Sequence, residues 1–488
     1  MTMSTPAVDR YRLDPLDRGV IGPLTRRQVV VIGAGALVWL LSSIAGAGMV
    51  VGLIPFVAAL AAAVPRFGGQ PVSDWVPVWC GWVLRGRRSR HWVRRLHLTS
   101  ALYPVATPQL PPWLGGLSLV AHPSAGWAAI HDRTGRTLTA HLQIAGAGFT
   151  TLSVDQMEVL VSGWGAVFSA VPVDDGVVRI TWSDIARRMP LVGHDAWAAG
   201  QHGDADCLAE YREFVAGTVP MRHDVVLTVT LRCGAVRDRR AEAEAMSRLE
   251  STVTIVRDAL GEAKLAAFGP LPAGELAYLL RSGLDPSSVE PSGGTRTGSL
   301  VQHLGLVPTA AAGPMRAVVS SRHVEVDASV HRSFWVESWP EQPQPADWFE
   351  PLLAGDDLAE VTQRIFTLIV EPIDDDRALA ELRHAASRHG GEQVAASEGR
   401  TRWDSFKARK ANAVAAREDE VAHGAGPVCY GGLVTVTVAD LADLQRAAHS
   451  VVRRFRRRRV LLRPLWGRMD LGVAAALPLG LGLSREPF

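Results

Sequence analysis

Lysine is the residue type that decides most about nucleotide chemistry in this sequence. A P-loop requires Gly-x-x-x-x-Gly-Lys followed by Ser or Thr, because the lysine neutralises the β- and γ-phosphates and the hydroxyl binds magnesium. The three lysines, Lys264, Lys407 and Lys410, are followed by leucine or alanine. The sequence therefore contains no Walker A motif, and we expect no nucleotide hydrolysis by this chain.

Other catalytic and metal-binding patterns are weak or absent in the sequence. It contains no HExxH, GxSxG or EF-hand motif, and its four cysteines show no CxxC spacing. His323, Glu325 and Asp327 alternate along one expected strand, a pattern that is more typical of a solvated strand face than of a metal site. We therefore expect no catalytic residue, no cofactor and no metal.

Glycines near the N-terminus imitate a dinucleotide-binding motif. Gly33 and Gly35 follow an apolar run, but Val38 stands where the third glycine belongs and the next acidic residue is Asp74. Glycines in an apolar segment also let two helices pack closely. We expect this packing role for Gly33, Gly35, Gly46, Gly48 and Gly52.

The segment that holds these glycines is free of charge from residue 28 to residue 65. A single helix over its 36 apolar or small residues, 29–64, would run about 54 Å, against a hydrocarbon core of about 30 Å. We therefore expect two membrane spans, at 29–45 and 48–64. Both flanks are basic, so the positive-inside rule predicts a multi-pass protein of the cell (cytoplasmic) membrane with both termini and the soluble domains in the cytoplasm. The alternative is a buried helix in a soluble core.

Tryptophans and arginines follow the uncharged segment at residues 72–95. Aromatic rings at helical spacing beside arginines suit the headgroup layer of a bilayer, whereas the alternative is an amphipathic helix of a soluble domain. The expected membrane-interface residues are Trp75, Trp79, Trp82, Arg85, Arg87, Arg88 and Trp92.

The rest of the chain alternates strand-like and helix-like segments. This order favours an α+β fold with ferredoxin-like split βαβ units, whose helices cover one face of an antiparallel sheet. The expected divisions are a membrane anchor at 1–98, a first α+β domain at 99–284, a linker or long loop rich in Pro, Ser and Gly at 285–329, and a second α+β unit at 330–488 with a long helical arm at 374–421.

The net charge of +2 hides a basic start, an acidic middle and a basic end. The basic end includes Arg453, Arg454, Arg456, Arg457, Arg458 and Arg459. This patch would attract anionic lipid, or it is a solvated helix end followed by a charged edge strand. Few aromatic residues accompany it, so nucleic-acid contact is less favoured and stays open.

Several segments carry a resemblance to a known family. They are the N-terminal hairpin with its Trp/Arg stretch through residue 95, HDRTGRTLTAHL, RIFTLIVEPIDDDRA and GLVTVTVADLADL. On these segments the chain resembles an actinobacterial family of conjugal-transfer membrane proteins with a PrgI-like N-terminus. The block at 461–482 is similar to the end of the N-terminal domain of type IV secretion ATPases, and Leu477-Pro478-Leu479-Gly480 matches its closing Leu-Pro-x-Gly.

The resemblance implies a non-enzymatic inner-membrane component of a conjugative or type IV-like secretion apparatus. Its implied partners are the lipid bilayer, a separate P-loop ATPase that the protein docks, other membrane components, and further copies in an oligomer. Two alternatives remain: a two-span scaffold of a type VII secretion machine, and a membrane-tethered enzyme of unknown chemistry.

Overall fold

The structure is a computed structural model, and it describes most of the chain between residues 26 and 482. The described ranges are 26–44, 49–63, 66–67, 70–84, 90–94, 108–145, 151–170, 176–188, 200–201, 204–217, 221–233, 239–288, 309–340, 344–353, 360–372 and 428–482, with scattered positions between 383 and 415. The arm expected at 374–421 therefore lies almost wholly outside the described residues.

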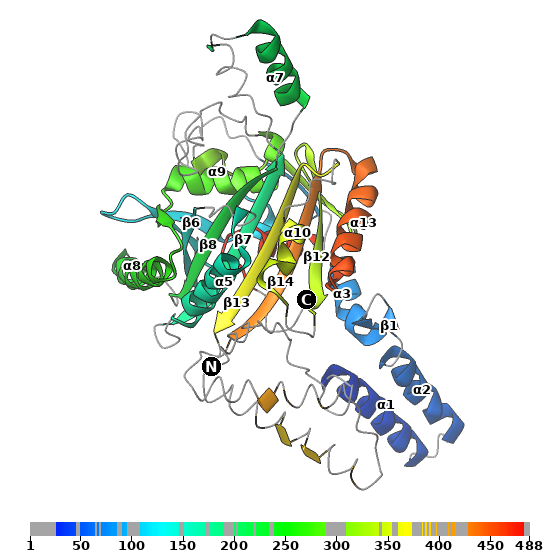
Figure 1. The fold of residues 1–488 in the computed structure, drawn as a ribbon. Helices are drawn as coiled ribbons and strands as arrows, with labels where there is room; N and C mark the ends of the chain where they lie inside the picture. Colours follow the sequence, from blue (N-terminus) through cyan, green and yellow to red (C-terminus); the bar gives the residue numbers. More distant parts are fainter. Residues whose placement is uncertain are drawn as a thin grey trace, which may run out of the picture.

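The uncharged N-terminal segment forms two helices, α1 (Arg26–Ile44) and α2 (Met49–Ala63), which project from the body as a hairpin (Figure 1). Helix α3 (Val72–Leu84) joins this hairpin to the body. A two-stranded ribbon, β1 (Arg66–Phe67) and β2 (Gln70–Pro71), lies between α2 and α3 in the chain.

The predicted membrane spans at 29–45 and 48–64 are wrong. Helix α1 begins with two arginines and a glutamine, so the part that follows these polar residues, 29–44, is about 24 Å long. Helix α2 has 15 residues, or about 22 Å, whereas a hydrocarbon core is about 30 Å thick. Among the described residues, no helix combines the length and the apolar character needed to cross a bilayer. This finding corrects the transmembrane part of the expected fold class and the expected multi-pass localisation in the cell membrane.

The body is built on one antiparallel sheet of 13 strands. Their order is β3-β10-β11-β12-β14-β13-β7-β8-β6-β5-β4, with β15 beside β12 and β9 beside β6. The strands are β3 (His91–Val93), β4 (Leu117–Ala121), β5 (Ala128–Asp132), β6 (Thr137–Ile144), β7 (Val177–Arg188), β8 (Met221–Arg232), β9 (Ala267–Pro270), β10 (Arg316–Val319), β11 (Val324–Val326), β12 (Ser329–Ser338), β13 (Gln363–Pro372), β14 (Val428–Val438) and β15 (Leu461–Pro464).

Two stretches of the sheet repeat one arrangement. Strands β9, β6, β8 and β7 lie side by side, as do β15, β12, β14 and β13, and in both sets the strands come fourth, first, third and second in chain order. This is the strand order of a ferredoxin-like split βαβ unit. The expected α+β class with an antiparallel sheet is therefore confirmed.

The second strands of the two units join them. Strand β13 pairs with β7 from Gln363 opposite Arg187 to Val370 opposite Ile180. Strands from the expected divisions 99–284 and 330–488 therefore share one sheet. The segment expected as a linker, 285–329, contributes β10 and β11 to the same sheet.

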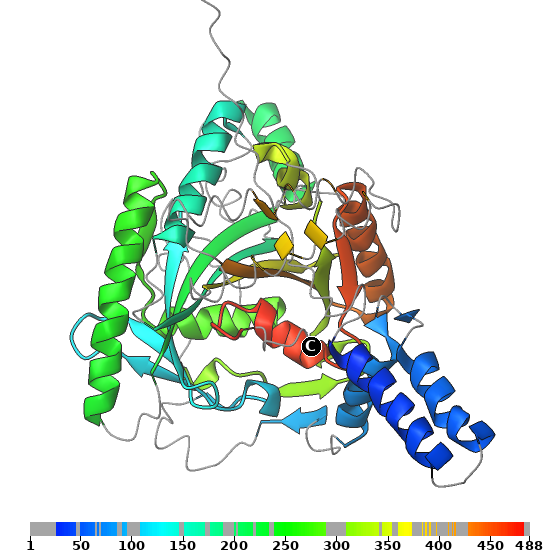
Figure 2. The same cartoon turned by 90° about the horizontal axis from the view of Figure 1, so that it is seen from below.

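Helices cover both faces of this sheet. On one face, apolar residues of the first unit pack under α5 and α8, and those of the second unit pack under α13 and α10. On the other face, α9 and α14 form a shared core with the sheet (Figure 2). The helices are α5 (Val154–Ser169), α7 (Ala205–Gly217), α8 (Arg239–Glu262), α9 (Ala273–Leu284), α10 (Glu350–Leu353), α13 (Leu441–Arg457) and α14 (Met469–Ala476).

Strand alternation explains the two faces. In β6, Leu138, Ala140 and Leu142 belong to the core under α8, whereas Thr139 and His141 point to the opposite face. Successive side chains of a strand point to opposite sides, so a strand with apolar and polar residues in alternation supplies one apolar core and one polar row. The polar row lies under the C-terminal segment that follows α14.

Candidate functional site

The C-terminal end of α13 presents a cluster of arginines. Asp440 caps the start of this helix, since its carboxylate accepts a hydrogen bond from the backbone N–H of Ala442. Its buried side consists of residues such as Val451 and Phe455, which fix the helix on the core of the second unit. The opposite side therefore points to solvent and holds the exposed residues Arg453, Arg456 and Arg457, and the exposed Arg458 and Arg459 follow directly after the helix.

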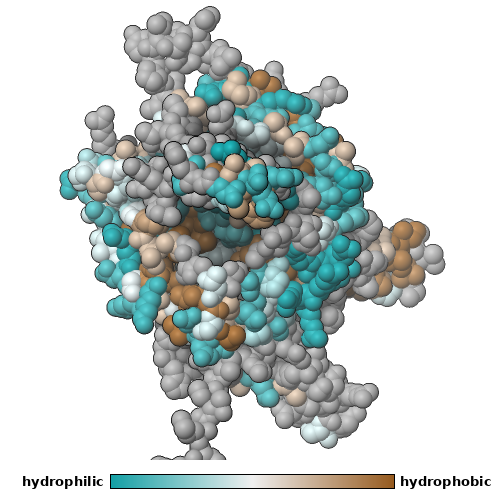
Figure 3. Space-filling view, turned by 45° about the horizontal axis from the view of Figure 1, so that its top comes forward, coloured by the Kyte–Doolittle hydropathy of each residue, from teal (hydrophilic) through white to brown (hydrophobic). Residues whose placement is uncertain are grey.

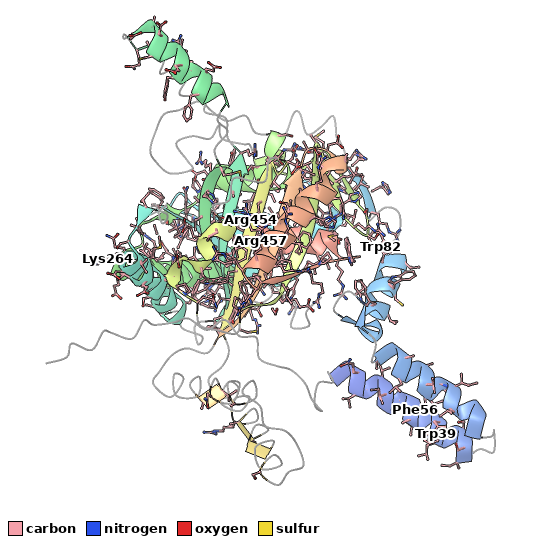
Figure 4. All side chains as sticks on the ribbon, turned by 45° about the vertical axis from the view of Figure 1, so that its right-hand side comes forward. Trp39, Phe56, Trp82, Lys264, Arg454 and Arg457 are labelled. Carbon is pink, nitrogen blue, oxygen red and sulfur yellow. The ribbon has the colours of Figure 1, made fainter. Side chains whose placement is uncertain are left out.

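These five arginines, the arginine cluster, have no ion-pair partner among the described residues. By contrast, Arg446, about two turns before Arg453 on the same helix, lies 3.2 Å from Glu360 and also pairs with Asp443. Arg454 is partly buried and has interactions of its own. Figure 4 shows Arg454 and Arg457 on α13. The cluster places five positive charges within seven residues and leaves them available for an acidic partner.

Helices α1 and α2 hold each other through a narrow inner face. The rings of Trp39 and Phe56 stack with their centroids 5.8 Å apart (Figure 4). Gly35 lies so close to Ala59 that a side chain at residue 35 would overlap it. Gly33, in contrast, has no atom within 4 Å of the place where a Cβ would stand. Of the glycines expected to pack the two helices, Gly46 and Gly48 lie outside the described residues, and the side-chain position of Gly52 is likewise not described.

The expected membrane-interface residues do not share one surface. Trp79 is 70% exposed on α3, whereas Trp82 packs against the core that contains α9 and α14. The guanidinium of Arg90 covers the Trp82 ring, 4.4 Å from its centroid. Trp75 is partly buried, and Trp92 lies in β3 against the same core as Trp82. Arg85, Arg87 and Arg88 lie outside the described residues.

A histidine–aspartate pair is the arrangement nearest to acid–base chemistry. His223 Nδ1 lies 2.9 Å from Asp184 Oδ1, and the buried Arg364 guanidinium lies 3.9 Å from the other carboxylate oxygen. Arg364 also donates to the carbonyl of Leu352 at 2.7 Å, so it fixes the end of α10 on the sheet. Such a pair can orient a general base, but no described hydroxyl or thiol is hydrogen-bonded to His223. Within the described part of the chain the pair therefore has no nucleophile beside it.

Pockets and metal clusters give no stronger candidate for chemistry. A small apolar pocket lies between β4, β5, α9 and the C-terminal segment; its free volume of about 10 Å³ is no larger than a water molecule needs, and Ser118 is its single polar lining residue. No group of three or more His, Cys, Asp or Glu side chains able to bind a metal occurs in the described part of the chain. His323 is 3.3 Å from Glu325, while Asp327 pairs with Arg281 instead.

Two buried histidines hold the ends of α9 and of the C-terminal segment. His141 Nε2 lies 2.6 Å from the carbonyl oxygen of Pro478, and His331 Nε2 lies 2.7 Å from that of Leu284. Burial lowers the pKa of both imidazoles to about 4, although the hydrogen bond to the carbonyl opposes the shift. Both rings are therefore neutral at pH 7 and act as structural donors.

Sequence reasoning did not find these histidines. The signal that could have found them is a single polar residue between apolar residues of an expected strand, as at His141 between Ala140 and Leu142. It also missed Glu275, whose carboxyl is buried without a hydrogen-bond partner in α9 and whose pKa burial raises to about 7.

Comparison with known proteins does not assign the chain to a family. No protein-family model matches it, and no curated protein matches it either.

Proposed function

We propose that the protein is a non-enzymatic docking component of a conjugative or type IV-like secretion apparatus, to which a separate P-loop ATPase binds. The apparatus and the ATPase come from the sequence resemblance. The lack of a Walker A motif supports the division of labour, because ATP hydrolysis then falls to the partner.

The observation that carries the proposal is the arginine cluster of α13. Its guanidinium groups are exposed and without described ion-pair partners, and the buried side of the helix fixes their position. Arginine binds carboxylates through two parallel hydrogen bonds, so a fixed group of five suits an acidic protein surface. We assign this surface to the ATPase.

A charge-reversal experiment tests the proposal. The tagged full chain is purified from its native cells, and the proteins that accompany it are identified by mass spectrometry. We expect a P-loop ATPase with the wild-type chain, and at least tenfold less of it with the double variant Arg456→Glu/Arg457→Glu. Capture should also fall in 0.5 M salt, because exposed ion pairs are screened.

A matched control uses the double variant Arg240→Glu/Arg257→Glu, which reverses two exposed arginines of α8. This control should retain the ATPase. Equal capture of the ATPase by both double variants would show that the arginine cluster is not part of the interface. ATP hydrolysis by the purified wild-type chain would overturn the docking function itself. Capture of a type VII secretion ATPase would instead favour the alternative apparatus.

A further inference from the structure

The outer surface of the α1–α2 hairpin is the largest exposed apolar feature of the described structure. Ten large apolar residues of the two helices are between 42% and 75% exposed. They are Val30, Leu37, Val38, Leu40, Leu41, Ile44, Leu53, Ile54, Val57 and Leu60. Figure 3 shows apolar residues on the part of the molecule that projects at the right of the view. Exposed patches of this size mark interaction sites.

The exposed residues recur at the spacing of a helix-packing seam. On α1, Val30, Leu37, Leu40 and Ile44 follow at intervals of seven, three and four residues. On α2, the exposed residues Leu53, Val57 and Leu60 follow at intervals of four and three. Such intervals place apolar side chains in one stripe along a helix and are typical of helices that pack against other helices. Each helix of the hairpin therefore offers one unoccupied stripe.

The inner face of the hairpin is occupied by the contacts between α1 and α2. Gly35 and Trp39 of α1 contact Ala59 and Phe56 of α2, and the Gln28 side-chain amide donates to the carbonyl of Ala63 at 2.7 Å. These contacts join the helices along their length. The outer stripes are therefore additional to the packing that holds the hairpin together.

The chemistry of this surface limits its partner. No charged residue occurs between residues 28 and 63, so a partner with charges at the contact would lose their hydration without gaining an ion pair. The partner must offer an uncharged apolar surface of two helical stripes. A second hairpin of the same chain has both properties, and a twofold axis places the same patch on both sides of the interface.

The exposed area is sufficient for such a contact. At ordinary residue areas the ten side chains expose roughly 1,000 Å² together, whereas each partner of a standard interface buries about 800 Å². The hairpin also projects away from the body in Figures 1 and 2, so two hairpins can approach without contact between the two sheets.

We propose that the α1–α2 hairpins of two copies of this chain pack together as a four-helix bundle and make the protein a dimer. Gly33, which has open space beside it, lies in the α1 stripe three residues after Val30 and provides room for a side chain of the other copy. Short helices in a bundle of four bury both stripes of each hairpin. The dimer is independent of ATPase docking, because the arginine cluster lies on α13.

Light scattering coupled to size-exclusion chromatography of the purified full chain tests this dimer in buffer without detergent. The wild-type chain should be a dimer at micromolar concentration. The double variant Leu37→Glu/Leu41→Glu should raise the dissociation constant at least 100-fold while circular dichroism shows unchanged helix content. The control Val154→Glu/Val159→Glu, which places the same charges on two exposed positions of α5, should remain a dimer.

A second measurement uses hydrogen exchange of the wild-type chain. Backbone amides of residues 37–44 should become more protected as protein concentration increases. A wild-type monomer at every concentration would overturn the dimer, as would a dimer that persists in the α1 double variant. Binding of monomeric wild-type chain to phosphatidylcholine vesicles would show that lipid covers the hairpin instead. A monomer that still captures the ATPase would overturn this inference and leave the proposed function intact.

Discussion

The imidazole Nε2 of His141 lies 2.6 Å from the carbonyl oxygen of Pro478, although 337 residues separate the two in the chain. His141 belongs to the first strand of the first ferredoxin-like unit, and Pro478 follows the last helix of the second. His331 and Leu284 form the reciprocal contact, since His331 lies in the first strand of the second unit and Leu284 ends α9. Each unit therefore holds the end of the other, and we expect the two to unfold together.

Acid should destabilise this arrangement. Burial lowers the pKa of His141 to about 4, whereas the unfolded chain titrates near 6.5. Between these values the unfolded state binds a proton that the folded state does not, so stability decreases as pH falls from 6.5 to 4 and is unaffected above that window. At pH 4.5 this histidine should cost about 2–3 kcal/mol relative to pH 7.

Urea unfolding at several pH values checks this effect. His141→Gln keeps an N–H donor but does not titrate, so its loss of stability between pH 7 and pH 4.5 should be smaller than that of the wild type by about 2 kcal/mol. The matched control is the same substitution at an exposed position, His449→Gln. Parallel pH profiles for wild type and His141→Gln would contradict a buried neutral imidazole.

Glu275 should act in the opposite direction. Glu275 is 4% exposed, and burial raises the pKa of its carboxyl group to about 7. The folded state therefore keeps a proton that the unfolded state loses near pH 4.5. Stability therefore decreases as pH rises from 4.5 to 7. Glu275→Gln removes this loss and should stabilise the protein by up to about 3 kcal/mol at pH 8, with little change at pH 5.

The same urea measurements, made at pH 5 and pH 8, test Glu275. Glu262, an exposed residue of α8, serves as the control, and Glu262→Gln should change stability little at either pH. A Glu275→Gln variant that is no more stable than wild type at pH 8 would show that the carboxylate is satisfied in the folded state.

Gly480 is expected to be essential for the C-terminal segment. It has φ of +70°, and a Cβ there would overlap the side chains of Thr139 and Thr230. Gly126 has a similar φ of +73° but no atom within 4 Å of a Cβ position. Alanine at either site costs about 1–2 kcal/mol for the left-handed backbone, and the overlap at Gly480 should add about 1–3 kcal/mol.

Thermal or urea unfolding of Gly480→Ala and Gly126→Ala compares the two positions directly. Because the backbone conformation is matched, the difference between them measures the packing of the segment on the sheet. Equal losses of stability would mean that residue 480 does not contact β6 and β8 as described.

Local patterns explain the part of the protein that could be predicted. The alternation in β6 and β14 identified strands, and the uncharged segment at 28–65 identified two helices with a reversal between them. The exposed side of α13 follows from its arginines in the same way. These features depend on neighbouring residues, whose spacing decides which side of a helix or strand is apolar.

The role of each of these elements could be assigned only from the whole fold. Trp82 resembles a membrane-interface residue by spacing, but it packs on the body, because the fold brings α9 and α14 to the same core. Helix α1 begins with Arg26, Arg27 and Gln28, helix α2 has 15 residues, and neither helix therefore supports the expected spans.

The sequence by itself determined the missing Walker A motif, the α+β alternation, the uncharged helical hairpin and the basic C-terminal block. Only the tertiary structure decided that β7 joins β13 and that His141 binds the carbonyl of Pro478. The physical reason is the separation along the chain of the residues that interact. Helix and strand patterns arise from residues a few positions apart, whereas strand pairing and burial depend on contacts between residues that lie hundreds of positions apart in the chain.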